Sequence, residues 1–130
     1  MAFEIMVVEG NLGTDVRESY TTGGVRVGSF MLAQSKRDKE GNDLQPTWYS
    51  VSCFGSVADV AVKLLRKGDR VKVTCRLSPD KTTGTPSVFQ RKDGNWAAGY
   101  DVVADCIGFT KLPSVLMEGG HDGISDDFAY

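Results

Sequence analysis

Two aromatic side chains share one face of a short segment in the middle of the chain. Residues 47–55 read TWYSVSCFG, and β-strand alternation puts Trp48 and Phe54 on one side and Tyr49 on the other. At roughly 3.3 Å per residue the two rings lie about 20 Å apart, so they would act as separate platforms. Every nucleic-acid base has a π-face, so such rings stack bases of any sequence, at about 1 to 3 kcal/mol each. The two serines between the rings leave room for a chain of nucleotides.

Basic side chains are numerous enough to follow the backbone of a nucleic acid. Residues 70–77 alternate, so one strand face is basic and the other apolar, and surface Lys and Arg neutralise phosphates. The candidate phosphate-binding residues are Lys36, Arg37, Lys67, Arg70, Lys72, Arg76, Arg91 and Lys92. Both groups have an alternative interpretation. The charges would also suit a solvated surface, and Trp48 and Phe54 would also suit a helix contact or a subunit interface.

Patterns typical of catalysis or metal binding are lacking. His121 is the single histidine, and it lies in a C-terminal segment without periodicity. Cys53, Cys75 and Cys106 are widely spaced, unlike metal-ligand or redox pairs, and we interpret them as buried, reduced thiols. We therefore expect no enzymatic activity, no cofactor and no metal site.

The composition predicts one soluble globular domain. Of the 130 residues, 41% are hydrophobic and 25% are charged, and the 15 glycines favour β-structure with many turns. The sequence has neither an apolar run of about 18 residues nor a secretory signal pattern. We expect a cytoplasmic protein with no membrane partner.

The charge is distributed unevenly along the chain. Residues 1–112 carry all 15 Lys and Arg and 13 Asp and Glu, a net charge of +2, whereas residues 113–130 carry four acids and no Lys or Arg, a net charge of −4. Such asymmetry is a cue for binding to nucleic acid or to a protein partner, even though the total is −2. We expect a mildly basic domain over 1–112 and a flexible, disordered acidic tail over 113–130.

The periodicities predict five main strands, one helix and a hairpin. Strands are expected at residues 4–9, 25–34, 47–55, 70–77 and 100–109. Residues 56–68 have helical spacing, with Ser56 as a candidate N-cap and Gly68 as the closing residue. The segment GNLG at 10–13 reads as a turn. This order suits an all-β protein with one helix, a five-stranded Greek-key barrel of the OB-fold type. An open sheet covered by the helix is the alternative.

Three blocks of the sequence resemble bacterial-type single-stranded DNA-binding proteins, the SSB family. The blocks are VVEGNLGTDV at 7–16, TWYSVSCFGSVADVAVKLLRKGDRVKV at 47–73 and DVVADCIGF at 101–109, and the likeness covers about residues 3–112. The resemblance implies an OB-fold homotetramer that binds single-stranded DNA without sequence preference. It also implies a nucleoid-associated protein that protects DNA during replication, recombination and repair, without catalysis.

The resemblance assigns roles to individual residues. Trp48 and Phe54 match two of the family's base-stacking aromatics, and Phe89 takes the place of a third, where the family usually has Trp. Lys67 in LRKG matches a basic position that contacts the DNA backbone in relatives. We expect Trp96 to be an added stacking platform.

The sequence departs from the family pattern in two places. After Ser35, where relatives commonly carry another stacking Trp, this chain has Lys36 and Arg37. The insert at 78–87 lengthens the hairpin before the last strand, which affects the alignment of Phe89.

The last residues resemble the acidic tip with which the family docks on replication and repair proteins. They read DGISDDFAY at 122–130. Asp126 and Asp127 would steer the encounter, and Phe128 and Tyr130 would supply buried area. The family more usually ends in Pro-Phe after a longer spacer. A solubilising tail without a partner is the alternative.

Two other functions stay open on the sequence alone. One is an OB-fold protein-interaction module, such as a primosome-like accessory protein, whose aromatics are interface core; the loss of one stacking position favours it. The other is RNA binding by the same surface, because nothing in the sequence reads the 2′-hydroxyl.

Overall fold

The computed structural model describes residues 4–117, which form eight strands and two helices. The strands are β1 (Met6–Leu12), β2 (Arg17–Tyr20), β3 (Arg26–Gln34), β4 (Thr47–Phe54), β5 (Arg70–Leu77), β6 (Val88–Gln90), β7 (Trp96–Ala98) and β8 (Tyr100–Phe109). The helices are α1 (Ser56–Leu64) and α2 (Ser114–Met117).

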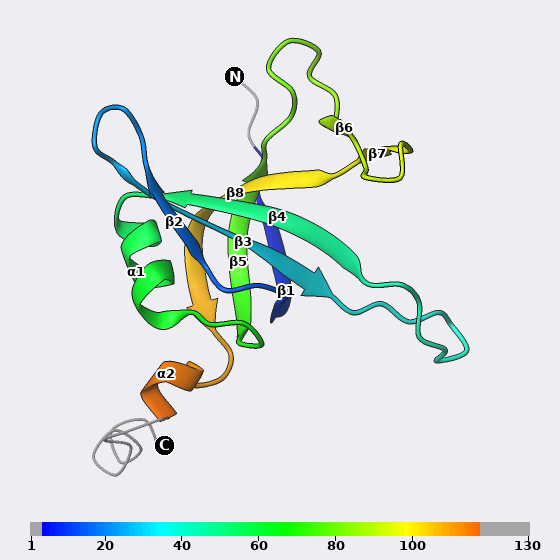
Figure 1. Ribbon diagram of the computed structural model, residues 1–130. Coiled ribbons are helices and arrows are strands. Elements are labelled where there is room, and N and C mark those ends of the chain that lie inside the picture. The colour runs from blue at the N-terminus through cyan, green and yellow to red at the C-terminus, as the bar shows by residue number, and fades with distance from the viewer. Residues whose placement is uncertain (1–3, 118–130) are drawn as a thin grey trace.

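Five of the strands close into a barrel (Figure 1). The sheet order is β1-β5-β8-β4-β3-β2, and β1 also pairs with β3, which completes the ring. The β4–β8 pair is parallel and the other pairs are antiparallel. Strand β2 extends the sheet beyond β3, and β6 and β7 form a separate hairpin. The predicted five-stranded barrel is confirmed and the open sheet is wrong.

The first strand runs further than predicted, because GNLG is not a turn. Residues 6–11 of β1 pair with β5, and Asn11 and Leu12 pair with β3. The strand therefore passes from one neighbour to the other at Asn11, directly after Gly10. A Cβ atom on Gly10 would overlap the carbonyl oxygen of Ala33. The glycine thus permits the close backbone approach that closes the barrel.

The core lies inside the barrel and under α1. Alternate residues of β3, β4, β5 and β8 point inward, as the strand period requires. Ala58 and Ala61 of α1 are fully buried against them, as is Leu65 just after the helix. The buried residues are Val8, Leu12, Phe30, Leu32, Val51, Cys53, Ala58, Ala61, Leu65, Val71, Val73, Cys75, Val102 and Ala104.

Both ends of the predicted helix need correction. Gly55, not Ser56, occupies the N-cap, and no side chain caps the helix. Gly55 has φ 63°, a conformation that favours glycine. The helix ends at Leu64, short of Gly68. Gly68 instead has φ 93° in the following turn, where its N–H donates to the Leu12 carbonyl at 2.8 Å.

The segment expected to be a tail begins with ordered structure. Ser114–Met117 form α2, which follows the buried Pro113. The Ser114 N–H donates to the Asp69 carboxylate at 3.1 Å. The described start of this segment thus has regular structure at Ser114–Met117, and the flexible tail stays a prediction. The predicted acidic tip, from residue 122 onward, lies outside the described residues.

The cysteines differ in exposure. Burial raises the pKa of the Cys53 and Cys75 thiols, as predicted for inert side chains. Cys106 is exposed, contrary to the prediction. Thr74 pairs with Cys106 while Cys75 pairs with Ala104, so β8 carries one extra residue there. This bulge reverses the alternation and turns Cys106 outward.

Substitution of Gly10 tests the closure of the barrel. Gly10→Ala should lower the free energy of unfolding by about 1 to 3 kcal/mol, because the added methyl group meets backbone that cannot move freely. Urea unfolding followed by circular dichroism, at one fixed protein concentration, measures the effect. Gly23→Ala is the matched control, since its Cβ would meet only one atom, at 3.9 Å. Equal stability of the two variants would contradict the close approach.

Candidate nucleic-acid interface

The alternation predicted for residues 47–55 is present in β4. Val51 and Cys53 are completely buried, whereas Trp48 and Phe54 are each 45% exposed. The exposed side chains stand on the outside of the barrel, where β4 pairs with β3. Burial of the two rings in a helix contact within the chain is therefore wrong.

A surface hollow of about 510 Å³ gathers aromatic side chains beside Trp48. We call it the aromatic hollow. Its lining includes Met31, Trp48, Ser50, Phe89, Arg91, Tyr100 and Asp101. These residues come from β3, β4, β8 and the β6–β7 hairpin, so only the folded chain assembles them.

Close packing on a glycine positions Trp48. A Cβ atom on Gly13 would overlap Cζ3 and Cη2 of the Trp48 ring. Gly13 directly follows β1, and its N–H donates to the Met31 carbonyl at 2.8 Å. The indole is thus supported along one edge while 45% of the residue stays exposed.

The β6–β7 hairpin presents its two aromatic residues on opposite faces. Phe89 pairs with Ala97, and Trp96 pairs with Gln90, so strand alternation separates the rings. Phe89 faces the aromatic hollow, where its ring lies 3.4 Å from the position of a Cβ on Gly99. Trp96 is 69% exposed and is not among the residues that line this hollow. Of the two predicted platforms on the hairpin, only Phe89 lies beside Trp48.

Tyr100 is an aromatic residue of the aromatic hollow that was not predicted from the sequence. It is 56% exposed and opens β8, directly opposite Tyr49 in the parallel β4–β8 pair. The ring centroids of the two tyrosines are 5.8 Å apart. Burial raises the pKa of Tyr49, whose hydroxyl lies 3.4 Å from Gln34 Oε1. An aromatic residue at the start of the last strand was the signal available in the sequence.

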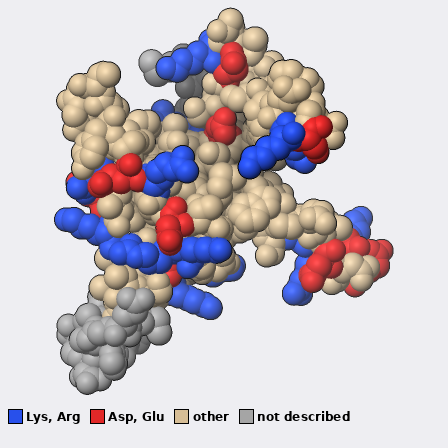
Figure 2. Space-filling model, in the orientation of Figure 1, with Lys and Arg blue, Asp and Glu red and all other residues tan. Residues whose placement is uncertain are grey.

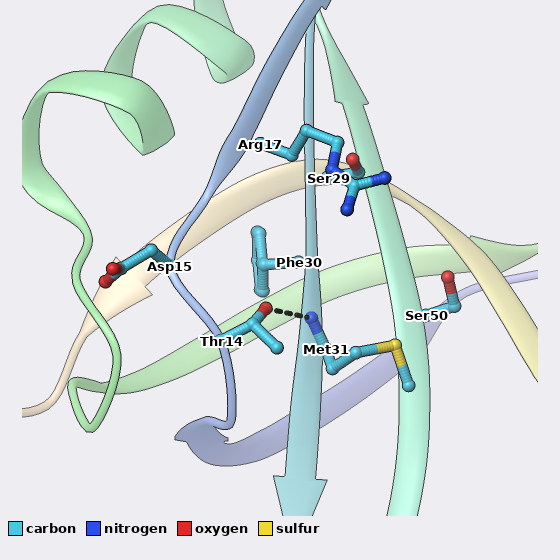
Figure 3. Close-up of a pocket in the computed structure, with 7 residues that line it drawn as sticks. All are labelled: Thr14, Asp15, Arg17, Ser29, Phe30, Met31 and Ser50. Carbon is cyan, nitrogen blue, oxygen red and sulfur yellow. Dashed lines mark hydrogen bonds between the residues drawn. The ribbon is translucent and has the colours of Figure 1, made fainter.

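A second hollow, of about 280 Å³, adjoins the first (Figure 3). We call it the polar hollow. Its lining consists of Thr14, Asp15, Arg17, Ser29, Phe30, Met31 and Ser50. Met31 and Ser50 line both hollows, so the two hollows adjoin each other on β3 and β4. Arg17 is a second residue that sequence analysis missed, because β2 is short and polar.

Phe54 stands apart from both hollows. It lies six residues along β4 from Trp48, opposite Val27 of β3. It belongs to neither lining, although its exposure equals that of Trp48. The two rings are therefore separate surfaces on one side of the strand, as the sequence predicted.

The predicted phosphate-binding residues are dispersed. Arg91 lines the aromatic hollow, and the backbone N–H of Lys67 donates at 2.8 Å to the carboxylate of Asp15. The other predicted cations lie on β5 or in hairpin turns: Arg70, Lys72 and Arg76 on β5, Lys36 and Arg37 between β3 and β4, and Lys92 between β6 and β7. Figure 2 shows separated groups of Lys and Arg around a largely uncharged central surface.

Several of these cations already pair with carboxylates. Arg70 contacts Glu9 at 3.2 Å, and Arg76 contacts Asp105 at 3.0 Å. The Asp105 hydrogen bond raises the pKa of Arg76 above its usual value. Such exposed pairs contribute little to stability. A phosphate bound there would compete with the carboxylate.

The β3–β4 hairpin tip carries charges of both signs. Arg37 pairs with Asp43 at 3.2 Å. Backbone N–H groups of Asn42 and Glu40 donate to Asp38 and hold the pKa of its carboxyl below the usual value. The tip is therefore less basic than Lys36 and Arg37 suggest.

Two kinds of feature are absent from residues 4–117. No group of three or more His, Cys, Asp or Glu is arranged to hold a metal ion. Within the same residues, neither helix has the length and apolar character needed to cross a membrane.

Gly13→Ala tests how Trp48 is held. The methyl group should displace the indole from its support and make it more accessible, so acrylamide should quench its fluorescence more strongly. The measurement uses a Trp96→Phe background, because the chain has two tryptophans. Gly23→Ala in the same background is the control. Unchanged quenching in the Gly13 variant would show that Gly13 does not support the ring.

Known proteins resemble this chain over most of its length. The model of the "Single-strand binding protein family" matches residues 3–109. The Single-stranded DNA-binding protein of Xanthomonas campestris pv. campestris is 37% identical over 103 residues, which are 77% of this chain and 56% of that protein. The protein of the same name from Xylella fastidiosa is 33% identical over 77% of this chain and 58% of its own length.

More distant relatives carry the same name. The Single-stranded DNA-binding protein of Neisseria meningitidis serogroup A is 29% identical over 108 residues, which are 81% of this chain and 58% of that protein. The chain thus spans about half the length of the curated relatives it matches. The family model covers well over half of the chain and includes every strand of the barrel. The chain therefore belongs to the single-strand binding protein family.

Proposed function

We propose that this chain binds single-stranded DNA without sequence preference. The observation that carries the proposal is the aromatic hollow, in which Trp48, Phe89 and Tyr100 line one surface with Arg91 and which adjoins the polar hollow. Exposed rings offer stacking surfaces, and nearby cations offer partners for phosphates. The names of the relatives support the same ligand.

The proposed mechanism combines stacking with charge neutralisation. Trp48, Phe54 and Phe89 stack bases, with Trp96 as a more distant platform on the other face of its hairpin. The phosphates contact the cations predicted from the sequence, most directly Arg91, which lines the aromatic hollow. Because stacking uses the face of a base and not its edge, it explains binding without sequence preference.

The biological setting is part of the same proposal. We propose a homotetramer that covers single-stranded DNA during replication, recombination and repair, without catalysis. The proposal includes association with the nucleoid, because the proposed ligand is single-stranded DNA. Sedimentation velocity of the full chain tests the assembly, with a monomer or dimer at micromolar concentration as the contrary result.

Truncation of the stacking rings tests the proposed mechanism. Trp48→Ala and Phe89→Ala should each weaken binding to oligo(dT) by about 1 to 3 kcal/mol. Fluorescence anisotropy of labelled oligo(dT) at about 50 and about 200 mM salt measures the affinity, which should fall steeply with salt. Phe109→Ala is the matched control, because this 38%-exposed ring lies at the opposite end of β8 from Tyr100.

The alternatives predict different results. A protein-interaction module would leave oligo(dT) affinity unchanged in all three variants, with little dependence on salt. An RNA-binding protein would bind oligo(U) more tightly than oligo(dT) under the same conditions. Either outcome would contradict the proposed ligand.

The acidic C-terminal tip is proposed as a separate partner site. Asp126, Asp127, Phe128 and Tyr130 would dock on replication and repair proteins, with charge steering the encounter and aromatic rings supplying contact.

Removal of residues 124–130 tests the tip. Pull-down with the truncated chain should lose replication and repair proteins that the full chain retains. Affinity for oligo(dT) should stay equal or rise slightly, since an anionic segment competes with DNA for basic residues. The double variant Asp126→Asn with Asp127→Asn separates charge from length. Weaker DNA binding after truncation would count against this picture.

A further inference from the structure

A row of side chains crosses the outer face of the sheet between the two rings of β4. Arg17 of β2 pairs with Ser29 of β3, and Ser29 pairs with Ser52 of β4. Ser52 is four residues from Trp48 and two from Phe54, or about 13 and 7 Å along the strand. A chain of nucleotides that reaches both rings therefore passes over this row.

The positive charge of Arg17 is not committed to a neighbour. The two carboxylates nearest in sequence have other partners. Asp15 accepts the Lys67 N–H at 2.8 Å, and Glu18 pairs with Arg26 at 3.0 Å. None of the ion pairs within residues 4–117 includes Arg17. An exposed guanidinium that forms no ion pair keeps its N–H donors available for a ligand.

The Arg17 side chain lies in the polar hollow beside hydroxyl groups. In Figure 3 it extends across β3 toward β4, with its guanidinium next to Ser29, whereas the Asp15 carboxylate points away. Ser29 and Ser50 line the same hollow, and Thr14 Oγ1 accepts the Met31 N–H at 3.2 Å. The hollow thus brings together the N–H donors of a guanidinium and the O–H donors of serine side chains.

We infer that Arg17, assisted by the Ser29 hydroxyl, binds a backbone phosphate of the single strand between the bases on Trp48 and Phe54. This inference rests on the proposed function and names a subsite within it. The planar guanidinium matches phosphate oxygens bidentately, and serine hydroxyls are common phosphate donors. The only ring in the hollow, Phe30, is 4% exposed and offers no stacking surface, so a phosphate suits the hollow better than a base.

The salt dependence of binding tests this subsite. With oligo(dT) of about 16 nucleotides, close to the most that one such barrel covers, Arg17→Gln should reduce the slope of log affinity against log salt by about 0.7. Affinity at about 50 mM salt should fall about five- to tenfold, the counterion contribution of one phosphate. Arg17→Lys should retain most of the slope, since it keeps the charge.

Neutral oligonucleotides separate a phosphate contact from a base contact. When methylphosphonate linkages replace the phosphates, Arg17→Gln should no longer differ from the wild type. Lys111→Gln removes an equal charge from the segment after β8, outside both hollows, and should leave the slope nearly unchanged. Circular dichroism confirms that each variant is folded.

Two results would overturn the inference and leave the function standing, and a third would overturn both. Arg17→Gln with wild-type slope, while Trp48→Ala still weakens binding, removes the subsite and leaves the function standing. An undiminished Arg17→Gln effect on the methylphosphonate strand assigns Arg17 to a base. If the wild type binds neither this oligo(dT) nor a longer one, the proposed function fails and the subsite with it.

Discussion

The pairing of β3 with β4 is the interaction on which both the core and the candidate interface depend. Its register places Phe30 opposite Val51 inside the barrel and Met31 opposite Ser50 outside. Because side chains alternate, a slip of one residue would exchange the two sets. Burial of the inner set therefore fixes the direction of Trp48. An aromatic ring stays exposed here because its neighbours in the strand are needed in the core.

Strand β1 closes the barrel and leads directly into the glycine that supports the candidate interface. This strand pairs with β5 as far as Asn11 and with β3 at Asn11 and Leu12, and the next residue, Gly13, supports the Trp48 ring. The absence of side chains at both glycines allows a backbone approach in the first case and a ring contact in the second. The segment that reads as a turn in the sequence is thus a structural part of the site.

The sequence correctly predicted the features that depend on local periodicity. It did not predict the features that depend on pairing between residues far apart in the chain. Strand alternation correctly predicted that Trp48 and Phe54 share an exposed face, and helical spacing correctly predicted the position of α1. The turn assigned to GNLG was wrong because glycine signals both a turn and a close approach. The outward direction of Cys106 depends on a bulge against β5 that local alternation cannot reveal. Arg17 was missed because its position beside Ser29 arises only in the folded sheet.

The most direct test of the account uses Trp48 as its own reporter. In the Trp96→Phe variant Trp48 is the single tryptophan, so its fluorescence can be followed while oligo(dT) is added at about 50 mM salt. The account predicts strong, saturable quenching as bases stack on the exposed indole, with a midpoint that agrees with the affinity measured by anisotropy. Saturated binding with unchanged emission would contradict the account, because the DNA would then occupy a surface away from the aromatic hollow.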